Sequence, residues 1–438
     1  MGIGVAVNRV RMVLSDRGGE LKELATKSHQ VVTLAACVGA ATGLFVAGFD
    51  RLIVEGILAH VLRLRPWLIA LLPGCGLVAA LFIRRWVDPT ATPATADEYL
   101  HAFHDSQHDL RWRPLLARTL ASVATLGSGA PMGLEGPSLY TGATIGNRLQ
   151  QRFPRTFKGS DRRVLMVAGA AAGVAAIFKA PATGVVFALE VPYQDDLARR
   201  MLLPALVAAG TGYLTFAVVN GTDPLFPITG SAAFSVRDVL GAVVVGIIAG
   251  IGARAFAKLL RIAKKIATMP RPLLIAIAAG CTLAVTFALG RVLTGQSLMM
   301  TSGYNVVAWA AVPGHSIPLM LAILVLRSLA TSAAVAGGGV GGVFIPLVVG
   351  GALTGSIIGN AVHPADITLF IVIGVAAFLG AGYRVPLAAV MFVAETTGRP
   401  SFIVPGLFAA VAAELMMGTA SVTRYQKPMN LPFSPAKD

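Results

Sequence analysis

The chain has 438 residues, of which 55% are hydrophobic and only 13% are charged, and its formal net charge is +15. A composition this apolar indicates a helical protein that crosses a membrane several times. The positive charge lies mostly outside the apolar stretches, which argues against nucleic acid as a partner and predicts that both termini are cytoplasmic. The basic clusters are residues 9–17, 152–163, 254–265 and 424–437.

The apolar stretches, in chain order, are residues 31–49, 67–83, 202–219, 239–257, 273–289 and 317–326. Segments between them, such as residues 165–178, are too short for a straight crossing of about 20 residues. We therefore expect an all-α polytopic membrane protein with tilted and partly broken helices. That pattern is typical of secondary transporters, in which half-helix ends meet near the middle of the membrane.

One carboxylate lies among glycines in the stretch from Gly127 to Pro137, at the start of an apolar segment. This residue is Glu135. An acidic side chain at membrane depth indicates a functional site by default. Gly-rich backbone at that depth is tolerated only where it lines a cavity or is buried in protein, so the loop is predicted to face a solute path.

Two passages of the chain repeat with Pro, Phe and Glu at identical offsets. They are Pro181, Phe187 and Glu190 in the first copy and Pro386, Phe392 and Glu395 in the second. The repeat predicts an internal duplication, and we expect both glutamates to cap or pair at helix ends.

A single transmembrane domain over residues 1–438 is expected, with a first repeat at 30–220 and a second at 235–425. Residues 220–237 would join the two repeats. No C-terminal cytoplasmic domain is expected after Leu431. With an odd number of crossings in each half, the repeats become inverted in the membrane, which brings their two Gly-rich loops together.

The second Gly-rich loop runs from Gly338 to Pro346 and suits a helix N-terminus. Two such N-termini aimed at one point would bind a small anion through unpaired amides and partial positive charge. Tight packing of small residues is the alternative for this loop. Glu135 is itself an anion, so it can compete with the solute anion and act as a gate that protonation releases. A helix-capping role is its alternative.

These residues resemble the CLC family of chloride channels and proton-coupled chloride transporters. Residues 133–137 look like the family's G(K/R)EGP element and residues 342–346 like its GxFxP element. The resemblance implies a fold of about eighteen helices in two inverted-topology repeats and a homodimer with one pore per subunit. It also implies Glu135 as the gate and an anion site formed by Gly136, the amides of Val343 and Phe344, and the Tyr425 hydroxyl.

Three departures from the family pattern are visible in the sequence. Leu134 replaces a basic residue beside the gate. The family's GSGIP loop is missing from residues 88–98, where Thr95, followed by Glu98 in a capping-box pattern, is our substitute for its serine. Thr90 and Thr92 remain open alternatives.

The third departure concerns proton coupling. Proton-coupled members commonly carry a second glutamate where this chain has Val191. Valine cannot carry a proton, so selective transport of chloride or a similar anion is expected to be passive or weakly coupled. The alternative is a proton-coupled antiporter for chloride or fluoride that uses another proton route.

Other clusters carry weaker signals. His101, His104 and His108 have helical spacing, but a solvated loop is favoured over a metal or pH-sensing site. The cysteines show no spacing typical of a metal site or a disulfide. The apolar segments lack a nucleophile beside a base, so we expect that the protein is not an enzyme and that it binds no cofactor apart from chloride ions. The predicted location is the cytoplasmic membrane of a prokaryote.

Overall fold

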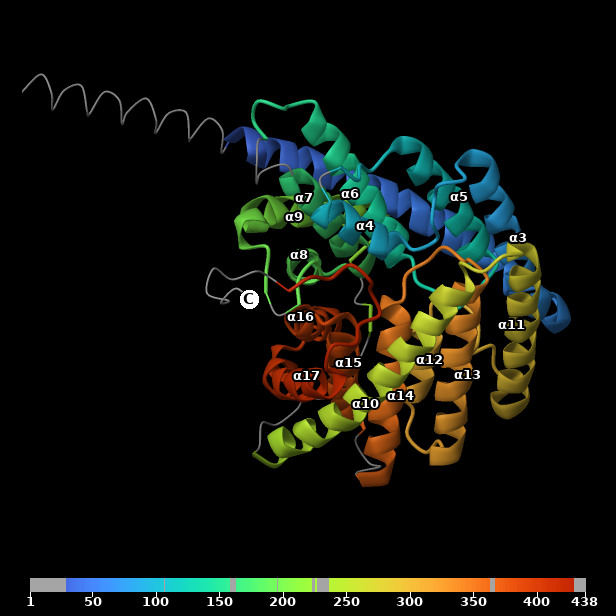
Figure 1. The fold of residues 1–438 in the computed structure, drawn as a ribbon. Helices are drawn as coiled ribbons and strands as arrows, with labels where there is room; N and C mark the ends of the chain where they lie inside the picture. The colour runs from blue at the N-terminus through green and yellow to red at the C-terminus, as the bar shows by residue number, and fades with distance from the viewer. Residues whose placement is uncertain are drawn as a thin grey trace, which may run out of the picture.

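The computed structural model describes residues 29–105, 107–157, 163–194, 196–222, 225–226, 236–362 and 367–428. These residues form helices and connecting turns, with two isolated β-bridges (Figure 1). The basic cluster at residues 9–17, most of the predicted connection at 220–237 and the C-terminal residues after 428 lie outside the described residues.

Eight helices of the described part are long and apolar enough to cross a membrane. The first is His29–Val61, which contains the π-helical segment η1 (Arg51–Leu58) and ends in α2 (Ala59–Val61). The others are α3 (Pro66–Val87), Arg199–Asn220, which contains η3 (Arg199–Met201) and α9 (Leu202–Asn220), α10 (Val236–Ile266), α11 (Pro272–Thr294), α13 (Ile317–Ala336), α14 (Phe344–Val362), and Pro400–Met417, which contains η4 (Pro400–Phe402) and α17 (Ile403–Met417).

Shorter helices complete the fold between these spans. They are α4 (Thr95–His104), α5 (Trp112–Gly127), α6 (Glu135–Gln151), α7 (Val164–Phe178), α8 (Pro181–Glu190), α12 (Tyr304–Ala310), α15 (Thr368–Tyr383) and α16 (Pro386–Thr397). Every residue of α7 is buried. A helix that is apolar on all sides has no face suited to water, so α7 lies among other helices.

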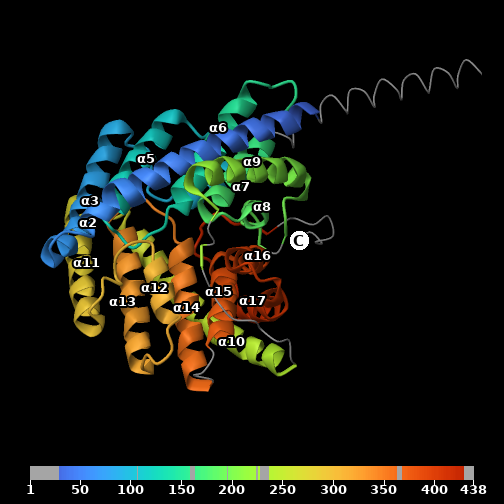
Figure 2. The ribbon, with the colours of Figure 1, turned by 180° about the vertical axis from the view of Figure 1, so that it is seen from behind.

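The same series of elements occurs twice. After α5 the chain forms α6, α7, α8, η3 and α9, and after α13 it forms α14, α15, α16, η4 and α17. The second and third helices of each series are joined through a residue in the left-handed conformation, Lys179 or Arg384, followed two residues later by a proline that begins the next helix. Figures 1 and 2 show most elements of the first half above those of the second.

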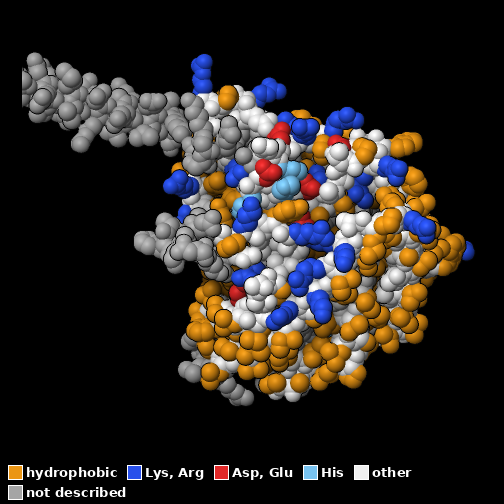
Figure 3. All heavy atoms as spheres, viewed as in Figure 1, with side chains coloured by type: hydrophobic (Ala, Val, Ile, Leu, Met, Phe, Trp, Pro, Cys, Tyr) orange, Lys and Arg blue, Asp and Glu red, His pale blue; other side chains and the backbone are white. Residues whose placement is uncertain are grey.

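The predicted fold class, an all-helical protein with two related halves, is confirmed by this architecture. The numerical boundaries of the halves, 30–220 and 235–425, stay a prediction. Figure 3 shows hydrophobic side chains gathered over the lower part of one face, with charged side chains and histidines above them. Exposed large apolar side chains such as Leu240, Ile251 and Leu274 suit contact with lipid.

Close contact between α6 and α7 depends on glycine. A Cβ atom placed on Gly142 would lie 2.0 Å from the carbonyl oxygen of Gly169, and one placed on Gly146 would lie 1.8 Å from that of Leu165. Both obstacles are backbone atoms, which cannot move aside as a flexible side chain can. The two helices therefore cross at a distance that only glycine permits.

Gly142→Val is expected to destabilise the folded protein by at least about 1–3 kcal/mol, because overpacking forces the backbones apart. The matched control is Gly210→Val, since no atom lies within 4 Å of a Cβ placed there. The measurement is the fraction of detergent-solubilised protein that stays monodisperse after heating. Equal heat resistance of the two variants would contradict the predicted contact.

Candidate functional site

The two Gly-rich loops meet in the interior of the protein. Gly133 and Gly342 form an isolated antiparallel bridge, in which the N–H of Gly133 donates to the carbonyl of Gly342 at 2.9 Å and the reverse bond measures 2.7 Å. Helix α6 begins two residues after the first glycine, and α14 begins two residues after the second. The bridge therefore brings the N-termini of two helices to one place.

The Glu135 side chain lies at this meeting point and is 4% exposed. Its Oε1 accepts a hydrogen bond of 2.7 Å from the backbone N–H of Phe344, the first residue of α14. Its Oε2 is buried and has no hydrogen-bond partner. A Cβ on Gly133 or Gly342 would lie 1.8 or 2.0 Å from a carboxylate oxygen, so a side chain at either position would displace the carboxylate from its place.

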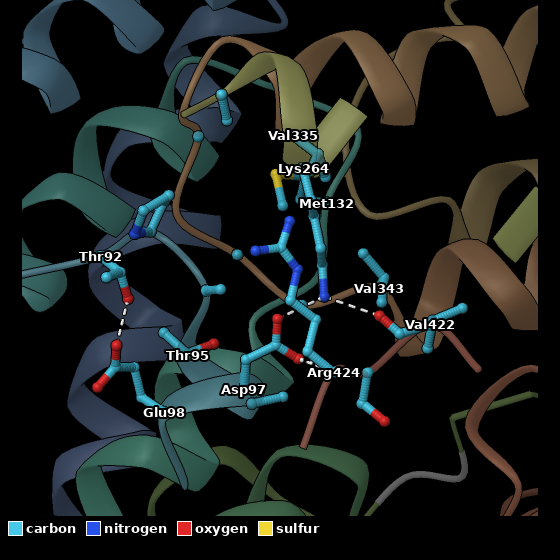
Figure 4. A pocket seen from close by; sticks show the side chains of 18 of the residues that line it. Thr92, Thr95, Asp97, Glu98, Met132, Lys264, Val335, Val343, Val422 and Arg424 are labelled. Carbon is cyan, nitrogen blue, oxygen red and sulfur yellow. Dashed lines mark hydrogen bonds and ion pairs between the residues drawn. The ribbon is translucent and has the colours of Figure 1, made fainter. Parts of the chain in front are cut away.

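A cavity of about 180 Å³ adjoins this site, since Gly342 and Val343 are among the residues that line it. Figure 4 shows it from close by. It is lined by Thr95, Gly342, Val343 and Tyr383, together with residues of the C-terminal segment. Gly136 adjoins the same region, since a Cβ placed on it would lie 2.5 Å from the Thr95 hydroxyl oxygen and 3.0 Å from the backbone of Gly342.

Two charged side chains in the wall of the cavity, those of Lys264 and Asp97, are paired with each other. The Lys264 ammonium lies 2.6 Å from Asp97 Oδ2 and donates to the carbonyl of Val422 at 2.7 Å. The backbone N–H of Arg424 donates to Asp97 Oδ1 at 3.1 Å (Figure 4). Sequence reasoning missed this pair, because 167 residues separate its members. It ties the C-terminal segment to α4 and α10.

Thr95 is the first residue of α4, so the helix begins where the sequence predicted. The predicted capping box between Thr95 and Glu98 is wrong. The position before the helix is Ala94, and no side chain caps the helix there. Glu98 instead accepts a 2.6 Å hydrogen bond from Thr92 and lies 3.3 Å from the buried guanidinium of Arg118. The cation draws the carboxylate away from its helix, because a buried arginine requires an anionic partner.

Tyr425 lies on the wall of the same cavity and is 39% exposed. Its ring stacks on His101 with centroids 4.7 Å apart, and His101 stacks on His108 at 4.1 Å. His101 and His108 thus belong to an ordered ring stack, whereas the ring of His104 lies edge-on to Tyr193. The predicted solvated loop is wrong. Among the residues that the structure describes, no group of three or more His, Cys, Asp or Glu side chains is arranged to hold a metal ion.

The duplicated glutamates cap each other's helices. Glu395, in α16, accepts hydrogen bonds from the N–H groups of Ala182 and Thr183 at the start of α8, at 2.9 and 2.6 Å. Glu190, the last residue of α8, accepts from Leu387 and Ala388 at the start of α16, at 3.1 and 2.9 Å.

This reciprocal pair agrees with the capping role expected from the sequence. Val191 follows Glu190 directly and is 1% exposed.

The structure has the features of a membrane transport protein built from two repeats. Its halves are related, two helix N-termini converge, and a buried acid lies between them. A family model described as voltage gated chloride channel covers residues 75–418. The chain therefore belongs to the voltage-gated chloride channel family, also called CLC, as the sequence motifs predicted.

Relatives span nearly the same length. The H(+)/Cl(-) exchange transporter ClcA of Citrobacter koseri is 26% identical over 411 residues, which cover 88% of this chain and 85% of that protein. The ClcA protein of Salmonella typhi is 25% identical over 412 residues, with the same coverage.

Solved structures share the fold. A slow cyanobacterial Cl-/H+ antiporter has a TM-score of 0.78 at 20% identity and covers 88% of this chain and 94% of its own. A CLC-type fluoride/proton antiporter has a TM-score of 0.72 at 23% identity, with coverage of 93% and 98%.

Replacing Glu190 by Ala is expected to cost about 1–3 kcal/mol of stability, because two buried N–H groups at the start of α16 lose their acceptor. Glu190→Gln keeps one carbonyl acceptor and should lose less. Glu395→Ala should behave like Glu190→Ala, since its contacts are the counterpart in the other repeat. Thermal unfolding of the purified protein in detergent checks this order. Normal stability of Glu190→Ala with lost anion flux would instead assign the residue a role in transport.

Proposed function

We propose that this protein transports chloride or a similar small anion across the membrane, through a route gated by Glu135. The observation that carries the proposal is the hydrogen bond between the Glu135 carboxylate and the first amide of α14, at the point where two helix N-termini meet. Membership of the chloride channel family supports anion transport as the general activity.

Backbone amides at helix N-termini stabilise negative charge through their N–H groups and the helix dipole. A carboxylate at such a place occupies the position that a permeating anion requires. The proposed anion site consists of the amides of Val343 and Phe344, together with Gly136, Thr95 and one tyrosine hydroxyl from the cavity wall. Protonation of Glu135 removes its charge and weakens its hold on the Phe344 amide, which frees the site.

Val191 supports passive or weakly coupled transport within this proposal. An apolar side chain that is 1% exposed provides no group that exchanges a proton with water. Glu190, beside it, already accepts two backbone hydrogen bonds and serves as a helix cap.

A second candidate function is proton-coupled antiport of chloride or fluoride. Its support is the naming of the relatives, since the ClcA proteins are H(+)/Cl(-) exchange transporters and one structural neighbour is a fluoride/proton antiporter. The missing GSGIP loop favours an anion selectivity different from that of typical members.

The same family resemblance supports a homodimer with one pore in each subunit. Bound chloride ions are expected, and no other cofactor is proposed. We place the protein in the cytoplasmic membrane of a prokaryotic cell, with the basic clusters on the cytoplasmic side.

Glu135→Gln and Glu135→Ala are expected to make anion flux insensitive to pH, because neither side chain can bind the α14 amides as a charge and be released by a proton. Wild-type flux should rise as the pH falls. Chloride efflux from proteoliposomes between acidic and neutral pH measures this. The control is Glu55→Gln, which changes an exposed acid in the first span. Unchanged pH dependence in both Glu135 variants would remove the residue from the gate.

Parallel records of anion efflux and proton uptake separate the two candidate functions. Passive or weakly coupled transport predicts anion flux with little accompanying proton movement. A fixed ratio of protons to anions would establish the antiporter instead, and competition among fluoride, chloride and nitrate would then identify the preferred anion. Absence of any anion flux from folded protein would contradict both.

A further inference from the structure

Two tyrosines line the cavity, and their surroundings differ. Tyr425 is 39% exposed and its ring stacks on His101. Tyr383, the last residue of α15, is 2% exposed. Its ring packs edge-on against Phe187 with centroids 5.4 Å apart and lies 6.1 Å from the ring of Phe344. Only the second tyrosine is held tightly beside the residues that form the proposed anion site.

The backbone around Tyr383 is fixed from both sides. Arg384, the next residue, has the left-handed conformation that ends α15. The carbonyl of Tyr383 accepts a 2.7 Å hydrogen bond from the Gln426 side chain, and the carbonyl of Gly382 accepts one of 3.0 Å from the N–H of Val422. The hydroxyl therefore has a defined position in the cavity wall.

At the position of Tyr383 the two repeats differ by the tyrosine hydroxyl. Counting back from Pro181 and Pro386, the residue that corresponds to Tyr383 in the first repeat is Phe178. Phe178 is also buried and packs against Phe344, with ring centroids 4.5 Å apart. A phenylalanine thus meets the packing requirement of this position. The additional oxygen in the second repeat adds a polar group to a buried site, where it requires a partner.

The Tyr383 side chain lines the cavity together with Val343, the residue that precedes Phe344. A phenol has an O–H to donate. In this structure the neighbouring amide, that of Phe344, is occupied by the Glu135 carboxylate. The O–H of Tyr383 and the N–H of Phe344 thus belong to adjoining parts of one site.

We propose that Tyr383 supplies the side-chain hydroxyl that binds the transported anion, in the role that the family pattern suggests for Tyr425. The inference rests on the proposed anion transport through this site. When Glu135 leaves, the anion takes its position at the Phe344 amide and accepts a hydrogen bond from the Tyr383 hydroxyl. A hydroxyl and an amide replace part of its hydration shell without a buried cation, so the anion can also leave.

Tyr383→Phe and Tyr425→Phe test the assignment, because each removes one oxygen and the first reproduces the residue present in the other repeat. Chloride and fluoride binding to the purified protein is measured by calorimetry. Loss of a hydrogen bond to a charged group predicts affinity about 10- to 100-fold weaker for Tyr383→Phe. Tyr425→Phe should bind as the wild type does.

Thermal unfolding with and without chloride separates anion binding from a purely structural role. A residue that binds the anion reduces the stabilisation that chloride confers, whereas a structural residue lowers the unfolding temperature equally in both conditions. The same measurement in a Glu135→Ala background repeats the test without the competing carboxylate. Tyr383→Phe should again reduce the stabilisation that chloride confers.

Normal anion affinity of Tyr383→Phe would overturn the assignment while leaving the proposed function in place. The same conclusion would follow if only Tyr425→Phe lost anion affinity. An equal loss of unfolding temperature with and without chloride would overturn it too. Wild-type protein that binds neither anion would overturn both proposals.

Discussion

The hydrogen bond between the Glu135 carboxylate and the Phe344 amide depends on a wider constraint, which is the pairing of two Gly-rich loops from distant parts of the chain. Both loops must approach without side chains, because any Cβ on Gly133 or Gly342 would overlap the carboxylate. Once they meet, two helix N-termini direct their unpaired amides at one buried position. The position attracts negative charge, and the protein's own acid occupies it.

The reciprocal caps of Glu190 and Glu395 extend the same physical principle to the contact between the halves. Each glutamate belongs to one repeat and satisfies the first amides of a helix in the other. Their exchange fixes α8 against α16, and the aromatic rings of Phe187, Phe344 and Tyr383 pack in the same region. This contact between the repeats lies beside the two loops, and it holds together the elements around the proposed gate.

On the side of the cavity, two cations are paired with carboxylates other than Glu135. Lys264 pairs with Asp97, and Arg118 pairs with Glu98. Because buried cations hold their nearest carboxylates, the described contacts of Glu135 remain with backbone amides, whose attraction for an anion is weaker than that of a full charge. A site built from partial charges suits the binding and release of an anion that the proposed transport requires.

The sequence by itself determined the helical membrane fold, the duplication and the two loops, because apolar length, glycine and proline act locally and leave a readable pattern. It also identified Glu135, since one acid among glycines is visible without a structure. Partners across the chain were decided only by tertiary structure. Glu98 binds Thr92 and Arg118 and does not cap α4, and Tyr383, a residue without any motif, lines the cavity together with Val343. Buried polar groups bond to whatever packing brings within reach, and that distance is not encoded in local spacing.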